Sequence, residues 1–106
     1  MTAYRSEVMI NTQKLLNLLF GFQSQRETAL KILEFIKANQ TAKPEDLRKL
    51  ELSKKRFYTV MSKLKDIGLV RISRGKDKKV FYTLRADYFK EKFNDLIKDV
   101  VKELQI

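Results

Sequence analysis

The chain has 106 residues, 43% hydrophobic and 34% charged, which supports a single domain with one modest core. It lacks cysteine and histidine and its three glycines are isolated, so disulfides, thiol or imidazole catalysis, common zinc sites and Gly-rich phosphate loops are excluded. The net charge of +10 points instead to a polyanionic partner, and we expect no cofactor, no metal and no enzymatic activity.

The first helical pattern covers residues 11–22. Asn11 or Thr12 can cap a short helix that leucine and phenylalanine side chains nearly encircle. Such a helix must be covered on more than one side, and in so small a domain we expect a second subunit to supply the second cover. The apolar run at 15–22 is far too short to span a bilayer, so no membrane partner and a cytoplasmic location are expected.

Two further helices are expected before the basic part of the chain. Residues 26–38 carry apolar side chains at helical spacing, with charged side chains facing outward. Pro44 suits the first turn of a third helix, and the two acidic residues that follow it suit a helix N-terminus.

The pattern at 54–67 predicts a fourth helix, with Ser53 as its N-cap and Gly68 as the glycine that ends it. Its buried stripe is expected to comprise Phe57, Val60, Met61 and Leu64. Its opposite, exposed face is expected to carry Lys55, Tyr58, Thr59, Ser62 and Asp66.

After Gly68 the period changes from 3.6 to 2. Residues 69–74 and 79–84 are typical of two strands, with a hairpin tip at 75–78. Asp87 can then cap a long helix that reaches Leu104 and carries one continuous apolar stripe.

Positive charge is concentrated in this second half. Residues 53–85 contain eleven lysines and arginines against two aspartates, a net +9 of the chain's +10. The rest of the chain is nearly neutral, so the excess is not spread for solubility. One cationic face with a neutral remainder favours nucleic acid as the partner.

The order of elements resembles the winged helix-turn-helix fold, a mainly α fold with a small β-hairpin (α+β). The resemblance covers residues 26–84 and rests on Ser53, on the core pattern Val60, Met61 and Leu64, and on Gly68-Leu69-Val70 fifteen residues after the capping serine. It is closest to archaeal and bacterial dimeric transcription regulators of the MarR, ArsR and PadR kind. Residues 1–106 are accordingly expected to form one domain, with an N-terminal helix at 11–22, the winged core at 26–84 and a C-terminal dimerisation helix at 86–105.

The resemblance implies that 54–67 is the recognition helix and 69–84 the wing. The major groove admits one α-helix, whose N-terminal half reaches the bases, while wing lysines reach phosphates or the minor groove. The expected DNA-binding residues are Ser53, Lys54, Lys55, Arg56, Tyr58, Thr59, Ser62, Lys63, Arg74, Lys76, Lys78 and Lys79. Tyr58 can either stack on DNA or lie across the core edge, and Asp66 and Asp77 are expected to relieve repulsion between cations. The metal switch of ArsR-like proteins does not carry over, because its Cys or His ligands are absent.

The C-terminal helix is about 27 Å long, more than a small domain can cover on one side, so we expect an antiparallel homodimer. The expected dimerisation residues are Leu15, Leu19, Phe20, Phe89, Phe93, Leu96, Ile97, Val100, Val101 and Leu104. The predicted function is a homodimeric, sequence-specific double-stranded DNA-binding protein, a transcriptional regulator. The alternatives are a non-specific architectural DNA-binding protein and a winged-helix protein-interaction module.

Overall fold

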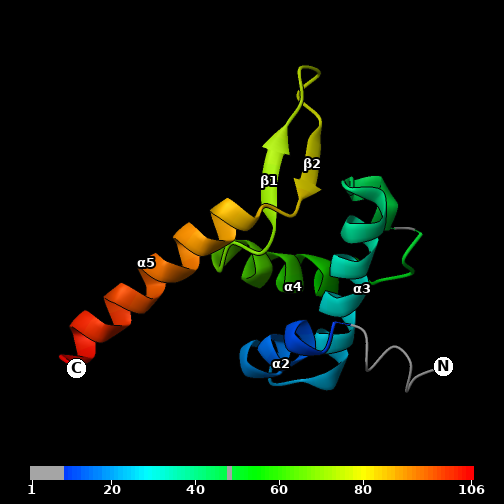
Figure 1. Cartoon of the computed structure of the whole chain (residues 1–106). Helices are drawn as coiled ribbons and strands as arrows, with labels where there is room; N and C mark the ends of the chain where they lie inside the picture. The colour runs from blue at the N-terminus through cyan, green and yellow to red at the C-terminus, as the bar shows by residue number, and fades with distance from the viewer. Residues whose placement is uncertain (1–8, 48) are drawn as a thin grey trace.

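The structure is a computed structural model that describes residues 9–47 and 49–106. Its elements in chain order are α2 (Ile10–Leu19), α3 (Gln23–Asn39), the 3-10 helix η1 (Pro44–Leu47), α4 (Lys54–Asp66), β1 (Arg71–Arg74), β2 (Val80–Thr83) and α5 (Ala86–Leu104). Helices α2, α3 and α4 form the body, the β1–β2 hairpin projects from it, and α5 extends away to one side (Figure 1). The chain is mainly helical with a small antiparallel hairpin, which confirms the α+β class predicted from the sequence.

The core lies where α3 and α4 meet. Helix α3 buries apolar side chains at helical spacing, including Ile32, Leu33 and Ile36. The hydroxyl of buried Thr28 donates a hydrogen bond to the backbone oxygen of Ser24 at 2.9 Å, so its burial leaves no unpaired donor. Helix α4 contributes the predicted stripe of Phe57, Val60, Met61 and Leu64, all of them buried.

Helix α2 differs from the prediction at its start and in its cover. It begins at Ile10, after Met9 in the left-handed region (φ 58°), and no side chain caps it, so Asn11 and Thr12 do not have the predicted role. Leu16 and Phe20 are buried in the chain's own core. Phe20 is only 1% exposed and is therefore not available to a second subunit, which corrects its assignment to the dimer interface.

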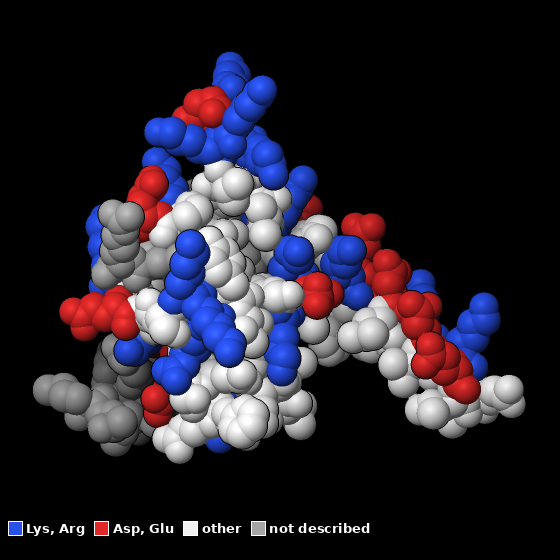
Figure 2. Space-filling view, turned by 180° about the vertical axis from the view of Figure 1, so that it is seen from behind, with Lys and Arg blue, Asp and Glu red and all other residues white. Residues whose placement is uncertain are grey.

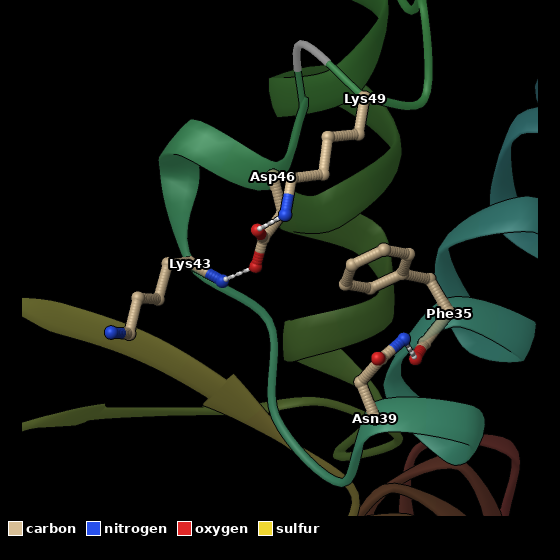
Figure 3. A network of polar contacts seen from close by, with 5 residues as sticks. All are labelled: Phe35, Asn39, Lys43, Asp46 and Lys49. Atoms are coloured by element: carbon tan, nitrogen blue, oxygen red, sulfur yellow. Dashed lines mark hydrogen bonds and ion pairs between the residues drawn. The ribbon is translucent and has the colours of Figure 1, made fainter.

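The predicted third helix is reduced to the four residues of η1. The chain before it is held extended, because Ala42 exchanges two backbone hydrogen bonds with Tyr82 of β2, at 3.0 and 2.7 Å. The Asp46 carboxylate accepts a hydrogen bond from the Lys43 backbone N–H at 2.7 Å and pairs with Lys49 at 3.6 Å (Figure 3). These contacts fix a tight turn where the sequence favoured a longer helix.

The ends of α4 follow the prediction closely. Ser53 has an extended backbone and its hydroxyl accepts a hydrogen bond from the Arg56 N–H at 3.2 Å, so it is the N-cap. Gly68, with φ of +86°, follows the last turn and lets the chain reverse into the hairpin. The two strands pair from Arg71 opposite Thr83 to Arg74 opposite Val80.

Helix α5 is an arm and contacts the body only through its first turns. None of its residues is buried; Tyr88, Phe89 and Phe93 are half-buried, and every residue after Phe93 is exposed. The radius of gyration is 14.7 Å, against about 13 Å for a compact chain of similar length. Arg85, rather than Asp87, occupies the N-cap position, and it has no side-chain cap bond.

Candidate nucleic-acid interface

The start of α4 is the most strongly cationic helix end in the described structure. Its first turn holds Lys54, Lys55 and Arg56 and no acidic residue. A helix N-terminus already carries partial positive charge, so each cation placed there is disfavoured by about 0.3–1 kcal/mol. An anion bound at this end would offset that local cost, because it meets both the side-chain charges and the free backbone N–H groups.

The side chains of α4 separate into two faces. The buried stripe anchors the helix on α3, while the face that carries Lys55, Thr59 and Ser62 is exposed along the whole helix. Hydroxyl and ammonium groups on this face can donate to base edges or phosphates, and the hydroxyls can also accept. One face of α4 therefore packs against the body, and the opposite, polar face is exposed to solvent.

Tyr58 lies at the edge of this face. Its ring makes an edge contact with Phe57, with centroids 5.3 Å apart and planes at 82°, and the residue is 46% exposed. It also lies beside Tyr82 of β2, whose pKa is raised first by burial and then by the proximity of Tyr58. The ring of Tyr58 therefore leans on Phe57 at the core edge but leaves much more than its hydroxyl accessible, and stacking on DNA stays a prediction.

The hairpin tip is built by a short hydrogen-bonded turn. The N–H of Lys78 donates to the Gly75 oxygen at 2.9 Å, and the N–H of Gly75 donates to the Lys79 oxygen at 3.0 Å. The Asp77 carboxylate accepts a hydrogen bond from the Lys79 backbone N–H at 3.1 Å. Asp77 thus shapes the turn that presents the lysines, a role that the sequence analysis missed although an Asp in a turn is a recognisable signal.

All twelve predicted DNA-binding side chains are exposed. They fall into one group on α4 and a second group at the hairpin tip. In the described part of the chain none of their cations forms an ion pair, since the salt bridges there join Asp46 to Lys49 and Asp87 to Arg85. Figure 2 shows lysine and arginine side chains from the hairpin tip down across the body in a single view.

Lys63 and Arg71 differ from the rest of the basic residues of this region. The Lys63 ammonium lies 5.1 Å from the centroid of the Phe20 ring, which ties it to the edge of the body. The Arg71 guanidinium of β1 lies 5.8 Å from the ring of Tyr88 in α5, and Lys92 lies 5.7 Å from the same ring. The Arg71–Tyr88 contact links the hairpin base to the arm, whereas the Lys92–Tyr88 contact lies within α5, and the sequence alone gave no sign of either.

The apolar stripe of α5 stays exposed where it leaves the body. Leu96 is 48% exposed and Leu104 is 62% exposed, and Ile97, Val100 and Val101 lie between them on the same stripe. Leu15 and Leu19 of α2 are half-buried, whereas Leu18 and Phe22 are prominently exposed and were not among the predicted interface residues. The described surface therefore offers apolar side chains on both the arm and the α2 corner.

One side of the arm is acidic. Asp87, Glu91, Asp95, Asp99 and Glu103 recur at every fourth position, which places them along one side of the helix. Figure 2 shows this row of acidic side chains running along the arm, next to its uncoloured apolar residues. The backbone N–H of Tyr88 and the Arg85 side chain lower the pKa of Asp87. The row will repel phosphates, so the cationic and anionic surfaces of the chain occupy different elements.

No protein-family model matches this chain, and no curated protein is significantly similar to it in sequence. Within the described residues, no helix is both long enough and apolar enough to cross a bilayer. The described acidic residues form no group of three that could hold a metal ion.

Proposed function

We propose that this protein is a winged helix-turn-helix protein that binds specific double-stranded DNA sequences as a homodimer and regulates transcription. In this proposal α3, η1 and α4 are the helix-turn-helix, α4 is the recognition helix and the β1–β2 hairpin is the wing. The backbone pairing of Ala42 with Tyr82 supports it, because it ties the segment before η1 to the hairpin. The recognition helix and the wing are then parts of one rigid unit.

The observation that carries the proposal is the exposed positive charge on α4 and the hairpin. The first turn of α4 holds three cations against its own helix dipole, and the hairpin tip adds Lys76, Lys78 and Lys79, all exposed. Both groups would neutralise phosphates at once and so release counterions from the DNA, while α4 enters the major groove. Affinity comes from the phosphates and selectivity from the side chains of α4 that reach base edges.

The dimer is proposed from the arm. Helix α5 leaves most of its apolar stripe exposed, and every described residue after Phe93 is at the surface. Antiparallel packing of two arms about a two-fold axis would cover both stripes and place two recognition helices on one side of a duplex. Their target would then be a pseudo-palindrome.

The test is selection of bound duplexes from a random pool, followed by footprinting of the selected sequence. The proposal expects one enriched, two-fold-related sequence and one short protected site. Continuous protection without enrichment would indicate an architectural protein instead. Unchanged migration of duplex DNA in low salt would contradict DNA binding altogether and would favour a protein-interaction module.

A further inference from the structure

Gly68 makes a close contact between the end of α4 and the α5 arm. A Cβ atom built on Gly68 would lie 2.7 Å from Cβ and 3.0 Å from Cγ of Lys92, and 3.2 Å from Cα of Phe89. Gly68, the residue after the C-cap Ile67 of α4, therefore touches the second turn of α5 with no room for a side chain. The positive φ of Gly68 explains a glycine at a helix end, but it does not by itself require this contact.

The burial of the arm is confined to its first turns. Among the described residues every one beyond Phe93 is exposed, and at the start of the helix Tyr88 lies within reach of Arg71 from β1. The direction of α5 relative to α4 is thus set over its first two turns. If the contact at Gly68 changes, no described contact further along α5 would hold the helix in its original direction.

We propose that Gly68 is the positioning residue that fixes the angle between α4 and the α5 arm, and thereby the spacing of the two half-sites that the dimer prefers. This inference rests on the proposed function, in which paired arms connect two recognition helices. Gly68 touches no DNA in this proposal. It acts through Lys92 and Phe89, the two α5 residues that lie against it.

The size of the expected movement at the end of α5 follows from the length of the helix. At about 1.5 Å per residue, Lys92 lies about 9 Å along α5 from Ala86, and Leu104 lies about 27 Å from it. Restoring an ordinary carbon–carbon contact at Gly68→Ala requires a shift of about 1 Å at Lys92. With Ala86 held by β2, the end of the arm then moves about 3 Å, close to the rise of about one base pair.

The first experiment measures the direction of α5 relative to the body in the absence of DNA. Spin labels on Lys37→Cys in α3 and Gln105→Cys after α5 report the distance from the body to the arm's end, because both sites are exposed and the chain has no native cysteine. Labelled chains are diluted with unlabelled protein so that only distances within one subunit contribute. Gly68→Ala is expected to shift the mean distance by about 3 Å. Gly21→Ala is the matched control, because a Cβ there meets nothing within 4 Å.

The second experiment measures which spacing between the two DNA half-sites the protein prefers. The probes are the duplex that the wild-type protein selects from a random pool and versions of it with one or two base pairs inserted or removed at the centre. For Gly68→Ala the preferred spacing is expected to move by about one base pair. The double variant Gly68→Ala with Lys92→Gly should restore the wild-type spacing, because it removes both Lys92 atoms from the contact.

A second variant covers the case in which Gly68→Ala does not fold. Lys92→Gly leaves Gly68 unchanged and removes the Lys92 side chain from the contact, so that only the Phe89 backbone remains there. The label distances should then broaden and off-centre spacings should be tolerated better. Lys90→Gly is its control, with the same loss of helix propensity at an exposed position two residues earlier, on the other side of the helix.

The outcomes separate the two proposals. A wild-type protein with a clear preferred spacing that Gly68→Ala and Lys92→Gly both retain would overturn the role of Gly68 alone. A change in label distance without a change in spacing would overturn it as well. A wild-type protein that binds DNA with no preferred spacing would overturn the dimeric readout and this inference together.

Discussion

Ser53 caps α4 with its hydroxyl oxygen, and in the proposed complex it also lies near a phosphate. The hydroxyl caps α4 by accepting from the Arg56 N–H, and the residue is exposed beside the cations of the first turn. An aspartate can cap a helix as well as a serine can, but it would add a negative charge where a phosphate is expected. Two substitutions at Ser53 therefore separate the roles.

Ser53→Ala should lower the free energy of unfolding by about 1 kcal/mol, because the cap bond is lost. Ser53→Asp should keep the stability of the wild-type protein or raise it, and should weaken duplex binding more than Ser53→Ala does. Urea unfolding measures the first effect and fluorescence anisotropy of a labelled duplex the second. Tight DNA binding by Ser53→Asp would show that no phosphate lies near the start of α4.

Lys55 and Thr59 lie on the exposed face of α4 and are expected to read bases. Lys55→Ala or Thr59→Ala should weaken the selected duplex by about 1–3 kcal/mol and weaken random DNA much less. Lys31→Ala on α3 is the control for charge, because Lys31 is exposed outside the proposed interface. Equal losses for selected and random DNA in each variant would contradict base readout by α4.

At the scale of elements, the hairpin should contribute affinity without selectivity. Lys78 lies at its tip with φ of 64°, exposed and away from the core. Lys78→Ala should weaken selected and random DNA alike and should reduce the slope of log K against log salt by about one unit for each phosphate contact removed. Binding titrations at several salt concentrations measure this. A loss confined to the selected sequence would instead place Lys78 at a base.

The elements also differ in how far the sequence determines them. Helix α4 was predicted to within a residue at each end, because its stripe, its capping serine and its terminal glycine agree. The helix expected after Pro44 was wrong in extent. Its segment has little apolar repeat, and backbone pairing of Ala42 with Tyr82, forty residues further on, keeps the preceding chain extended.

The candidate site shows the same division. The exposed cations of α4 and the hairpin follow from local periodicity, so all twelve predicted side chains are at the surface. Phe20 was misplaced because α2 is apolar all round, and only tertiary packing decides which side faces the core. The contact of Gly68 with Lys92 joins residues twenty-four positions apart, and no local pattern encodes it.

At the scale of the whole molecule, the proposed antiparallel pairing of arms can be tested by cross-linking. The apolar stripe runs from Phe89 to Leu104, so a two-fold axis through its middle passes near Ile97. Because the chain has no cysteine, Ile97→Cys should form a disulfide with its own copy under mild oxidation, whereas Gln105→Cys should not. Non-reducing electrophoresis reads both. Cross-linking at both Ile97 and Gln105 would instead indicate parallel arms, in which every residue lies at the height of its own copy.

For the proposed dimer as a whole, we also predict how strongly DNA affinity depends on salt. If each subunit neutralises about four phosphates, the slope of log K against log salt should be near −7. Leu104→Asp should disrupt pairing of the arms and bring the slope towards half that value, while Lys98→Asp, a charge change on the same helix outside the stripe, should leave the dimer intact. Sedimentation equilibrium checks the mass of each variant. A slope unaffected by loss of the dimer would contradict simultaneous binding of two subunits.

In the proposed dimer, the exposed apolar stripe of α5 also makes DNA binding sensitive to the concentration of the protein itself. A lone subunit would carry solvent-exposed leucine and valine side chains along a helix with little else to hold it, so its fold and its pairing gain from each other by mass action. Paired molecules increase with the square of the amount made when pairing is weak. A modest change in synthesis would then produce a disproportionate change in occupied binding sites, with no small-molecule signal required.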